Sequence, residues 1–195
     1  QLFIARDRIG IKPLYYSRIN NSIIFSSEIK PILKSGKIKK EFNNNILSSY
    51  LAHRYSFGNE TFFKEVYKFQ PGTYAYINSS KLNFYRYWDY KIVKKNKNNK
   101  LGFDKNLIES VNIRKMGDVP YGSFLSGGLD SSVVSYLLSK NNNMLNTYSI
   151  GFNWDGDETG FSKKISEIIK SKHNEIFFQD SDFDYLRKII WHMEE

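Results

Sequence analysis

The chain contains no cysteine, so disulfides and thiolate-bound metal sites are excluded, and the cytoplasm is the compartment that we expect by default. No run of apolar residues approaches the roughly 18 that a membrane-spanning helix requires, and we expect no membrane partner. Charged residues 6–8 interrupt the first apolar run, which excludes the pattern of a signal peptide. The three histidines have no metal-ligand spacing, and we expect structural roles for them: His53, His173 and His192.

An aromatic content of 16% and a hydrophobic content of 41% are typical of a globular protein with a sizeable core. A length of 195 residues allows one or two domains. The chain begins at Gln1 inside a strand pattern and ends at Glu195 inside a helix pattern. We therefore expect a piece of a longer protein.

The net charge of +9 is unevenly distributed. Residues 1–100 hold 19 Lys and Arg against 6 Asp and Glu, whereas residues 101–195 hold 10 against 14. A basic half of this kind leaves open a module that binds RNA. The lysine-rich run 94–100 has no aromatic residue to stack on bases, which favours a solvated surface and a basic linker. We expect no nucleic-acid partner.

Short runs of β-branched and aromatic residues, separated by turn residues, fill the first half of the chain and predict an antiparallel sheet. The predicted strands are residues 2–5, 14–16, 23–25, 74–77 and 82–88. Helical spacing of apolar residues predicts two short helices, at 29–33 and 46–53. Ser26 and Ser27 stand where a hydroxyl could cap the first of these helices.

Strands and helices alternate after a lysine-rich linker at residues 89–100. The predicted strands are 119–125, 147–152 and 175–178, and the predicted helices are 131–139, 162–172 and 183–193. Such alternation predicts right-handed βαβ units and a parallel sheet. The fold class expected for the chain is therefore α/β.

One seven-residue segment, Ser126-Gly127-Gly128-Leu129-Asp130-Ser131-Ser132, joins the first of these strands to its helix. Its two glycines allow a sharp turn and a close approach of the backbone to an anion. The free N–H groups and the dipole of the next helix favour phosphate oxygens there. Bare phosphate would repel Asp130, so this carboxylate indicates a bridging Mg²⁺. The segment predicts a phosphate site at the carboxyl end of a strand, where open parallel sheets bind ligands.

The segment differs from two common phosphate loops. The loop of kinases and GTPases ends in Gly-Lys-Ser/Thr, and no lysine follows Gly128. The dinucleotide fingerprint needs a third glycine at a fixed spacing, which is absent. An ordinary Gly-Gly turn is the simpler alternative, and the complete seven-residue pattern argues against it.

An acidic cluster follows the second strand of this half, at Asp155, Asp157 and Glu158. Its carboxylates could bind a metal or a substrate. We favour a solvated loop that caps the next helix, because Asp is a preferred capping residue.

Residues 117–132, Gly-Asp-Val-Pro-Tyr-Gly-Ser-Phe-Leu-Ser-Gly-Gly-Leu-Asp-Ser-Ser, closely resemble the pyrophosphate loop of glutamine-hydrolysing asparagine synthetases. Residues 148–152 resemble the family's second strand, and residues 173–176 resemble its His-His-Glu-Ile/Leu stretch. The last seven residues resemble its Val-Trp-His-Leu-Asp-Glu helix. Four further stretches resemble the later part of its glutaminase domain: residues 5–16, 25–30, 69–72 and 85–88. The resemblance covers nearly the whole chain, in the right order.

The resemblance implies two domains. Residues 1–88 would be the C-terminal part of a type 2 glutamine amidotransferase domain, an α+β sandwich of the Ntn type. Residues 89–100 would be a linker. Residues 101–195 would be the N-terminal part of an asparagine synthetase domain, a parallel-sheet ATP-pyrophosphatase similar to adenine-nucleotide α-hydrolases.

The resemblance also implies an enzyme with two sites. One site hydrolyses glutamine to ammonia with an N-terminal cysteine. The other activates aspartate with ATP as β-aspartyl-AMP, which ammonia converts to asparagine. By position, Leu125 and Ile150 would contact the nucleoside, and Asp130 would hold Mg²⁺. The full set of implied nucleotide-binding residues is Leu125, Ser126, Gly127, Gly128, Leu129, Asp130, Ser131, Ser132, Ile150 and Gly151.

Two parts of the family's sites do not occur in residues 1–195, namely the cysteine nucleophile and the second Ser-Gly-Glu/Asp-Gly stretch. We therefore assign no catalytic residue within the chain and expect it to be inactive alone, or at most a weak nucleotide binder. A sister enzyme that amidates or cyclises another carboxylate, as β-lactam synthetases do, stays open. Two further hypotheses also stay open: that the protein is a degenerate structural remnant, and that the full-length protein forms a homodimer.

Overall fold

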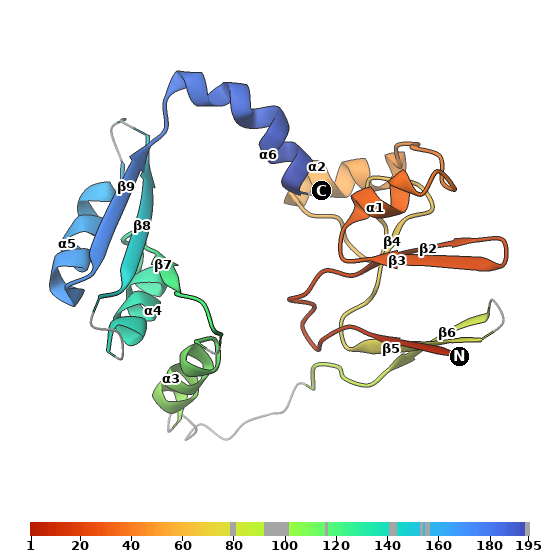
Figure 1. Cartoon of the computed structure of the whole chain (residues 1–195), viewed down its shortest axis with the longest axis horizontal. Coiled ribbons are helices and arrows are strands. Elements are labelled where there is room, and N and C mark those ends of the chain that lie inside the picture. The colour runs from red at the N-terminus through yellow and green to blue at the C-terminus, as the bar shows by residue number, and fades with distance from the viewer. Residues whose placement is uncertain are drawn as a thin grey trace. The chain divides into compact units, whose positions relative to one another are not determined.

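The computed structural model describes residues 1–78, 81–91, 102–115, 117–140, 144–152, 154 and 157–193. The described chain is α/β, as predicted, and divides into two compact units (Figure 1). The first unit comprises Gln1–Val93 with Arg187–Glu195, and the second comprises Lys94–Leu186. Most of the predicted linker at 89–100 lies outside the described residues. In the described ranges, no helix has the length and apolar character needed to cross a membrane.

The first unit contains two antiparallel sheets of three strands each, which confirms the predicted antiparallel pairing (Figure 1). One sheet has the order β1-β5-β6, with β1 at Leu2–Ala5, β5 at Thr73–Asn78 and β6 at Lys81–Arg86. The other has the order β3-β2-β4, with β2 at Tyr15–Ile19, β3 at Ser22–Ser26 and β4 at Tyr67–Lys68. The two-residue strand β4 was not predicted, because so short a segment has no periodicity.

Alternate residues of β2 enter the two cores of the first unit. Tyr16 packs between the sheets, against the buried residues Ile4, Phe69 and Ala75. Tyr15 faces the opposite way and packs under α1, the helix at Ile29–Lys34. The unit is therefore layered as sheet, sheet and helix. A 3₁₀ turn, η1 at Asn44–Ile46, leads into α2 at Leu47–His53.

The expected serine cap of α1 is wrong. The helix is capped by Glu28, which makes no side-chain capping hydrogen bond. The Ser26 hydroxyl instead accepts the N–H of Glu28 at 3.2 Å, ahead of the first turn. Ser27 lies one residue and Ser26 two residues before the capping position, because the helix begins only at Ile29.

The loop between β1 and β2 is held by Arg6 and Asp7. The Asp7 carboxylate accepts four backbone N–H groups at 2.7–3.2 Å, from Ile9, Gly10, Ile11 and Lys12. The Arg6 guanidinium donates to three carbonyls at 2.6–2.9 Å, those of Gly10, Lys12 and Phe69. The Lys12 N–H and the other amides lower the pKa of Asp7 against a smaller opposing effect of desolvation, because they favour its charged form.

The second unit is built on a parallel sheet with the order β7-β8-β9, as predicted. The strands are β7 at Gly122–Phe124, β8 at Asn146–Gly151 and β9 at Lys172–Phe177. The helices are α3 at Phe103–Ile113, α4 at Leu129–Ser139 and α5 at Thr159–Ile169. A 3₁₀ segment, η2 at Asp180–Tyr185, then leads into α6 at Leu186–Met193, which belongs to the first unit from Arg187 onward.

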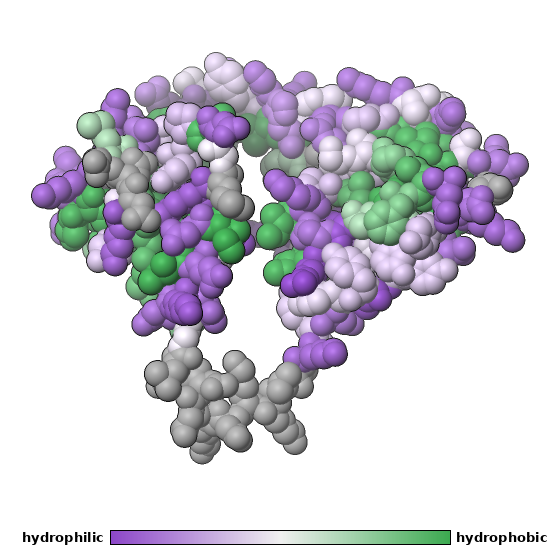
Figure 2. Space-filling model, turned by 60° about the horizontal axis from the view of Figure 1, so that its bottom comes forward, coloured by the Kyte–Doolittle hydropathy of each residue, from purple (hydrophilic) through white to green (hydrophobic). Residues whose placement is uncertain are grey.

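Helices α4 and α5 contact each other and pack on the same face of this sheet (Figure 1). Along β8 the buried residues are Thr147, Ser149 and Gly151, whereas Tyr148 and Ile150 between them are exposed. The buried set therefore points toward the helices. Hydrophobic residues also lie at the surface of both units, between hydrophilic ones (Figure 2).

The boundary between α5 and β9 lies earlier than predicted. The helix ends at Ile169 because Lys170 adopts a left-handed conformation, with φ of 54°, and the Ser171 N–H bonds back to the Ser166 carbonyl. Glycine is the usual residue at such a position, so the lysine gave no stop signal. The strand then begins at Lys172 rather than 175.

Candidate functional site

The predicted phosphate loop leaves the end of β7 as a tight turn. Leu125 continues the strand pairing, since its N–H donates to the Tyr148 carbonyl at 2.8 Å. Gly127 has φ of +85°, a conformation that favours glycine. A Cβ at this position would lie 2.6 Å from the Cβ of Phe161 and 2.9 Å from the backbone nitrogen of Ser162. The loop is thus pressed against the first turn of α5.

Serine hydroxyls hold this loop in shape. The Ser131 hydroxyl lies 3.0 Å from that of Ser126 and accepts the Ser126 N–H at 3.3 Å. The Ser131 and Ser132 hydroxyls donate to the Gly128 carbonyl at 3.1 and 2.7 Å. The side chains therefore bond to the loop itself and stabilise its turn.

Helix α4 begins within the seven-residue segment, at Leu129 rather than at the predicted residue 131, with Gly128 as its capping residue and no side-chain capping hydrogen bond. The first N–H groups of a helix have no partners within it. They point, with the positive end of the helix dipole, toward the loop. Asp130 is exposed in this first turn. The start of α4 therefore offers N–H donors to an anion beside one free carboxylate.

A cavity of about 440 Å³ adjoins the loop at the carboxyl ends of β7 and β8. Apolar and aromatic residues form much of its wall, while serines, a threonine and two carboxylates supply polar groups. The lining residues are Phe124, Leu125, Ser126, Tyr148, Ser149, Ile150, Phe152, Trp154, Asp157, Glu158, Thr159 and Ser162. An apolar pocket with a few convergent polar groups is typical of a small-molecule site.

The structure places the predicted site residues in two groups. Leu125, Ser126 and Ile150 line the cavity. Residues 127–132 form the turn and the first turn of α4, next to Ser126. Gly151 is not among the lining residues and is buried beside Phe177 and Thr159. The loop and the two strand ends therefore lie together, and Gly151 serves the packing behind them.

The capping residue of α5 is Glu158, which makes no side-chain capping hydrogen bond, and the preceding Asp157 binds the first N–H of the helix instead. The Asp157 carboxylate accepts the Thr159 N–H at 2.8 Å and the Phe152 N–H at 2.6 Å. Asp157 and Glu158 also line the cavity, which keeps open the alternative that these carboxylates bind a metal or a substrate. Asp155 lies outside the described residues.

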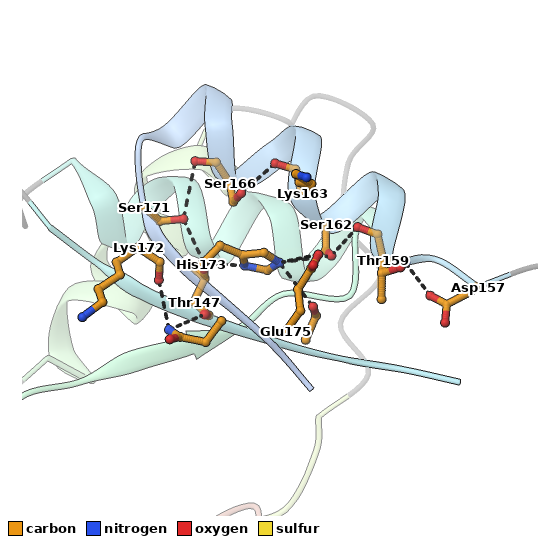
Figure 3. A network of polar contacts seen from close by, with 12 residues as sticks. Thr147, Asp157, Thr159, Ser162, Lys163, Ser166, Ser171, Lys172, His173 and Glu175 are labelled. Carbon is orange, nitrogen blue, oxygen red and sulfur yellow. Dashed lines mark hydrogen bonds and ion pairs between the residues drawn. The ribbon is translucent and has the colours of Figure 1, made fainter. Parts of the chain in front are cut away.

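Buried hydroxyl groups lie between the sheet and its helices, and Figure 3 shows part of the polar network that they form. The Ser123 and Ser135 hydroxyls pair at 2.9 Å between β7 and α4. Near the other edge, Thr147 pairs with Ser171 at 2.8 Å. Buried hydroxyls need such partners, because an unsatisfied one costs about 1–3 kcal/mol. This hydroxyl layer comprises Ser123, Ser135, Thr147, Ser149, Ser162, Ser166 and Ser171.

The His173 ring lies at the centre of the hydroxyl layer (Figure 3). Its Nδ1 is 2.9 Å from the Thr147 hydroxyl. Its Nε2 is 3.2 Å from the Ser149 hydroxyl, 3.4 Å from the Ser162 hydroxyl and 3.4 Å from Glu175. The ring connects β8 and α5 through two residues that line the cavity. Sequence reasoning left His173 without such a role, since its partners come from distant segments.

The described residues form no metal site made from protein ligands alone. No three or more His, Asp or Glu side chains among these residues gather closely enough to hold a metal ion. Asp130 stands as a single exposed carboxylate beside the loop. A hard cation here would need most of its oxygen ligands from a bound phosphate group and from water.

Two family models match the chain, one in each half. A glutamine amidotransferase domain matches residues 1–88, and an asparagine synthase domain matches residues 102–195. The first match covers both antiparallel sheets, and the second covers the parallel sheet, the loop and the cavity.

Individual relatives agree with the family models. A putative glutamine-hydrolysing asparagine synthetase of Methanocaldococcus jannaschii is 35% identical over the whole chain, which spans 40% of that protein. Asparagine synthetase 1 of Bacillus subtilis is 30% identical over the whole chain, which spans 32% of that protein. An amidase, chry2, of Gibberella zeae is 35% identical over 71% of the chain and 21% of its own length. The chain belongs to the glutamine-hydrolysing asparagine synthetase family.

Proposed function

We propose that the full-length protein containing this chain is an ATP-dependent ligase that makes asparagine from aspartate and glutamine-derived ammonia. The reaction proceeds through β-aspartyl-AMP and releases AMP and pyrophosphate. One observation carries the proposal: a glycine-rich loop, whose serine hydroxyls bond to one another and to its backbone, leads into α4 and adjoins a cavity of about 440 Å³. The matches to an amidotransferase domain and a synthase domain in one chain support it.

In this proposal, the loop and the cavity bind different parts of the nucleotide. Residues 126–132 hold the pyrophosphate portion of ATP through the N–H groups of the turn and the first turn of α4. Leu125 and Ile150 contact the nucleoside, since both line the apolar part of the cavity. Gly151 supports this wall from behind, through its contacts with Phe177 and Thr159.

The residues present fit a magnesium ion that is bound with the nucleotide. Mg²⁺ in nucleotide sites commonly takes one or two carboxylates, phosphate oxygens and water. Asp130 supplies one exposed carboxylate in the phosphate loop, and the described part of the chain holds no group of three or more carboxylate or histidine ligands. When bound, the ion would neutralise charge on the phosphates. Asp130 would hold it at the start of α4, where bare phosphate and this carboxylate would otherwise repel each other.

The ammonia-producing half of the reaction requires groups outside these residues. Residues 1–195 contain no cysteine, so the glutaminase nucleophile must come from elsewhere in the full-length protein. By themselves these residues are therefore proposed to be inactive. A reaction that consumes ATP, aspartate and glutamine supports a cytoplasmic location, where all three are available.

An amidation assay on the full-length protein tests the proposal, with ATP, Mg²⁺, glutamine and aspartate as reactants. The proposal expects asparagine and pyrophosphate in equal amounts, and loss of both in Asp130→Ala. Asp104→Ala is the matched control, because Asp104 occupies the first turn of α3 rather than α4. Full activity of Asp130→Ala, or no asparagine from the wild type, would refute the proposal.

A sister enzyme that acts on another carboxylate is the second candidate. The similarity to the amidase chry2 supports this candidate, since a protein with a different name matches 71% of the chain. Pyrophosphate release that depends on a different acid, with none on aspartate, would identify this alternative.

A further inference from the structure

We propose that His173 is a positioning residue of the nucleotide site, which aims the Ser149 hydroxyl into the cavity so that it donates a hydrogen bond to bound ATP. This inference rests on the proposed function. It concerns His173 and Ser149, which lie outside the loop motif at residues 126–132.

The hydrogen-bonding partners fix the direction of each proton around His173. An ionised carboxylate only accepts, so the contact with Glu175 places a proton on Nε2. The Ser162 hydroxyl donates to the Thr159 carbonyl at 2.8 Å, and it too can only accept from Nε2. In the neutral ring, Nδ1 then accepts from the Thr147 hydroxyl at 2.9 Å.

The contact with Nε2 determines whether the Ser149 hydroxyl acts as a hydrogen-bond donor or acceptor on the side of His173. Nε2 carries one proton, which its three acceptors share, and the Ser149 hydroxyl is the nearest of them at 3.2 Å. A hydroxyl that accepts this bond keeps its own O–H to donate elsewhere. Ser149 lines the cavity while its residue is only 6% exposed, so the open direction for that donor is the cavity. His173 thereby converts a buried serine into an oriented donor at the cavity wall.

The His173 ring is largely buried and is held on both sides by hydrogen-bonding partners. Its side chain is 10% exposed and is anchored from both nitrogens, by Thr147 on β8 and by Glu175 on β9. Ser162 of α5 lines the same cavity and touches the same nitrogen. The Ser162 backbone also packs beneath Gly127 of the phosphate loop. One side chain thus fixes the relative positions of β8, α5 and the floor of the loop.

The test compares variants of the full-length protein, with the affinity for a non-hydrolysable ATP analogue measured by calorimetry and with steady-state KM and kcat. His173→Asn removes the donor at the Nε2 position, and Ser149→Ala removes the hydroxyl it orients. Each should weaken nucleotide binding about 3- to 10-fold, the value of one neutral hydrogen bond. The kcat should stay within about twofold, because a contact made equally in ground and transition states affects KM alone.

Two further variants separate positioning from packing. His173→Gln carries an amide donor near the Nε2 position and should restore most of the affinity. The double variant His173→Asn with Ser149→Ala should bind no more weakly than His173→Asn alone, since both changes remove one interaction. Thermal unfolding of each variant reports its stability separately.

The outcomes are distinct. Unchanged affinity in Ser149→Ala would overturn the inference, and this variant decides the question if His173→Asn does not fold. Equal losses in His173→Asn and His173→Gln, with a lowered kcat, would also overturn it in favour of a packing role. A wild-type protein that binds no ATP analogue would overturn the proposed function and this inference together.

Discussion

Gly127 and Phe161 lie in contact at a distance that leaves no room for a side chain on the glycine. An ideal Cβ at position 127 would be 2.6 Å from the Cβ of Phe161. The phosphate loop and the first turn of α5 are therefore packed backbone against backbone. Any change that separates them should disturb the loop and the cavity together.

Replacement of Gly127 by alanine should destabilise the protein by about 2–4 kcal/mol, because a left-handed conformation and an overpacked contact are combined. Urea unfolding measures this loss. Gly160→Ala is the control in the same region, since a Cβ there meets nothing within 4 Å and α5 would gain helix propensity. Equal stability of Gly127→Ala and the wild type would contradict the close packing.

Replacement of Asp130 by asparagine should raise the Mg²⁺ concentration needed for pyrophosphate release about tenfold or more, because a charged ligand is lost. The stability should change by less than about 1 kcal/mol, since the exposed side chain only interacts with the dipole of α4. A magnesium titration of the full-length enzyme measures the first effect. An unaltered titration would show that Asp130 does not hold the ion. Removal of Mg²⁺ by a chelator should stop pyrophosphate release in both proteins.

Replacement of Gly151 by alanine tests a residue that the sequence assigned to the nucleotide. A Cβ there would lie 2.7 Å from the Phe177 ring and 2.8 Å from the Thr159 methyl carbon. We expect a loss of about 1–3 kcal/mol in stability from overpacking. Nucleotide affinity of the folded protein should fall less than in Ser149→Ala. A large loss of affinity with unchanged stability would instead support direct contact with the nucleotide.

Acidic pH should open the loop between β1 and β2. The pKa of Asp7 is lowered in the folded protein, so its contribution to stability is present above the carboxyl's ordinary pKa. The contribution shrinks as pH falls below that value and is lost once the folded carboxyl is protonated.

Hydrogen-exchange protection factors of the Gly10 and Lys12 amides, measured between about pH 3 and 7, report this opening. Asp7→Asn should show low protection across the whole range, because a neutral amide accepts these N–H groups more weakly. Constant protection in the wild type, even at a pH low enough to protonate the carboxyl of the folded protein, would contradict the prediction.

The alternation of elements in the second unit could be read from the sequence because apolar residues recur at helix and strand spacing there. The phosphate loop could be placed for the same reason, since it joins a clear strand to a clear helix. Gly127 and Ser126 carry their signal locally, in adjacent positions of one motif.

The rest of the site depends on contacts between distant segments. Thr147 and His173 are 26 residues apart and meet only because β8 and β9 pair in register. No spacing rule relates them. The start of β9 was also missed, because Lys172 and Asn174 look like loop residues until they pair with β8.

The hydroxyl layer between the parallel sheet and its helices has a thermodynamic consequence. Exposure of polar surface lowers the heat capacity of unfolding, whereas exposure of apolar surface raises it. Six residues of this layer, all serine or threonine, are buried in the folded chain: Ser123, Ser135, Thr147, Ser149, Ser162 and Ser166. The second unit should therefore have a small heat-capacity increment for its size, and its stability should vary gently with temperature.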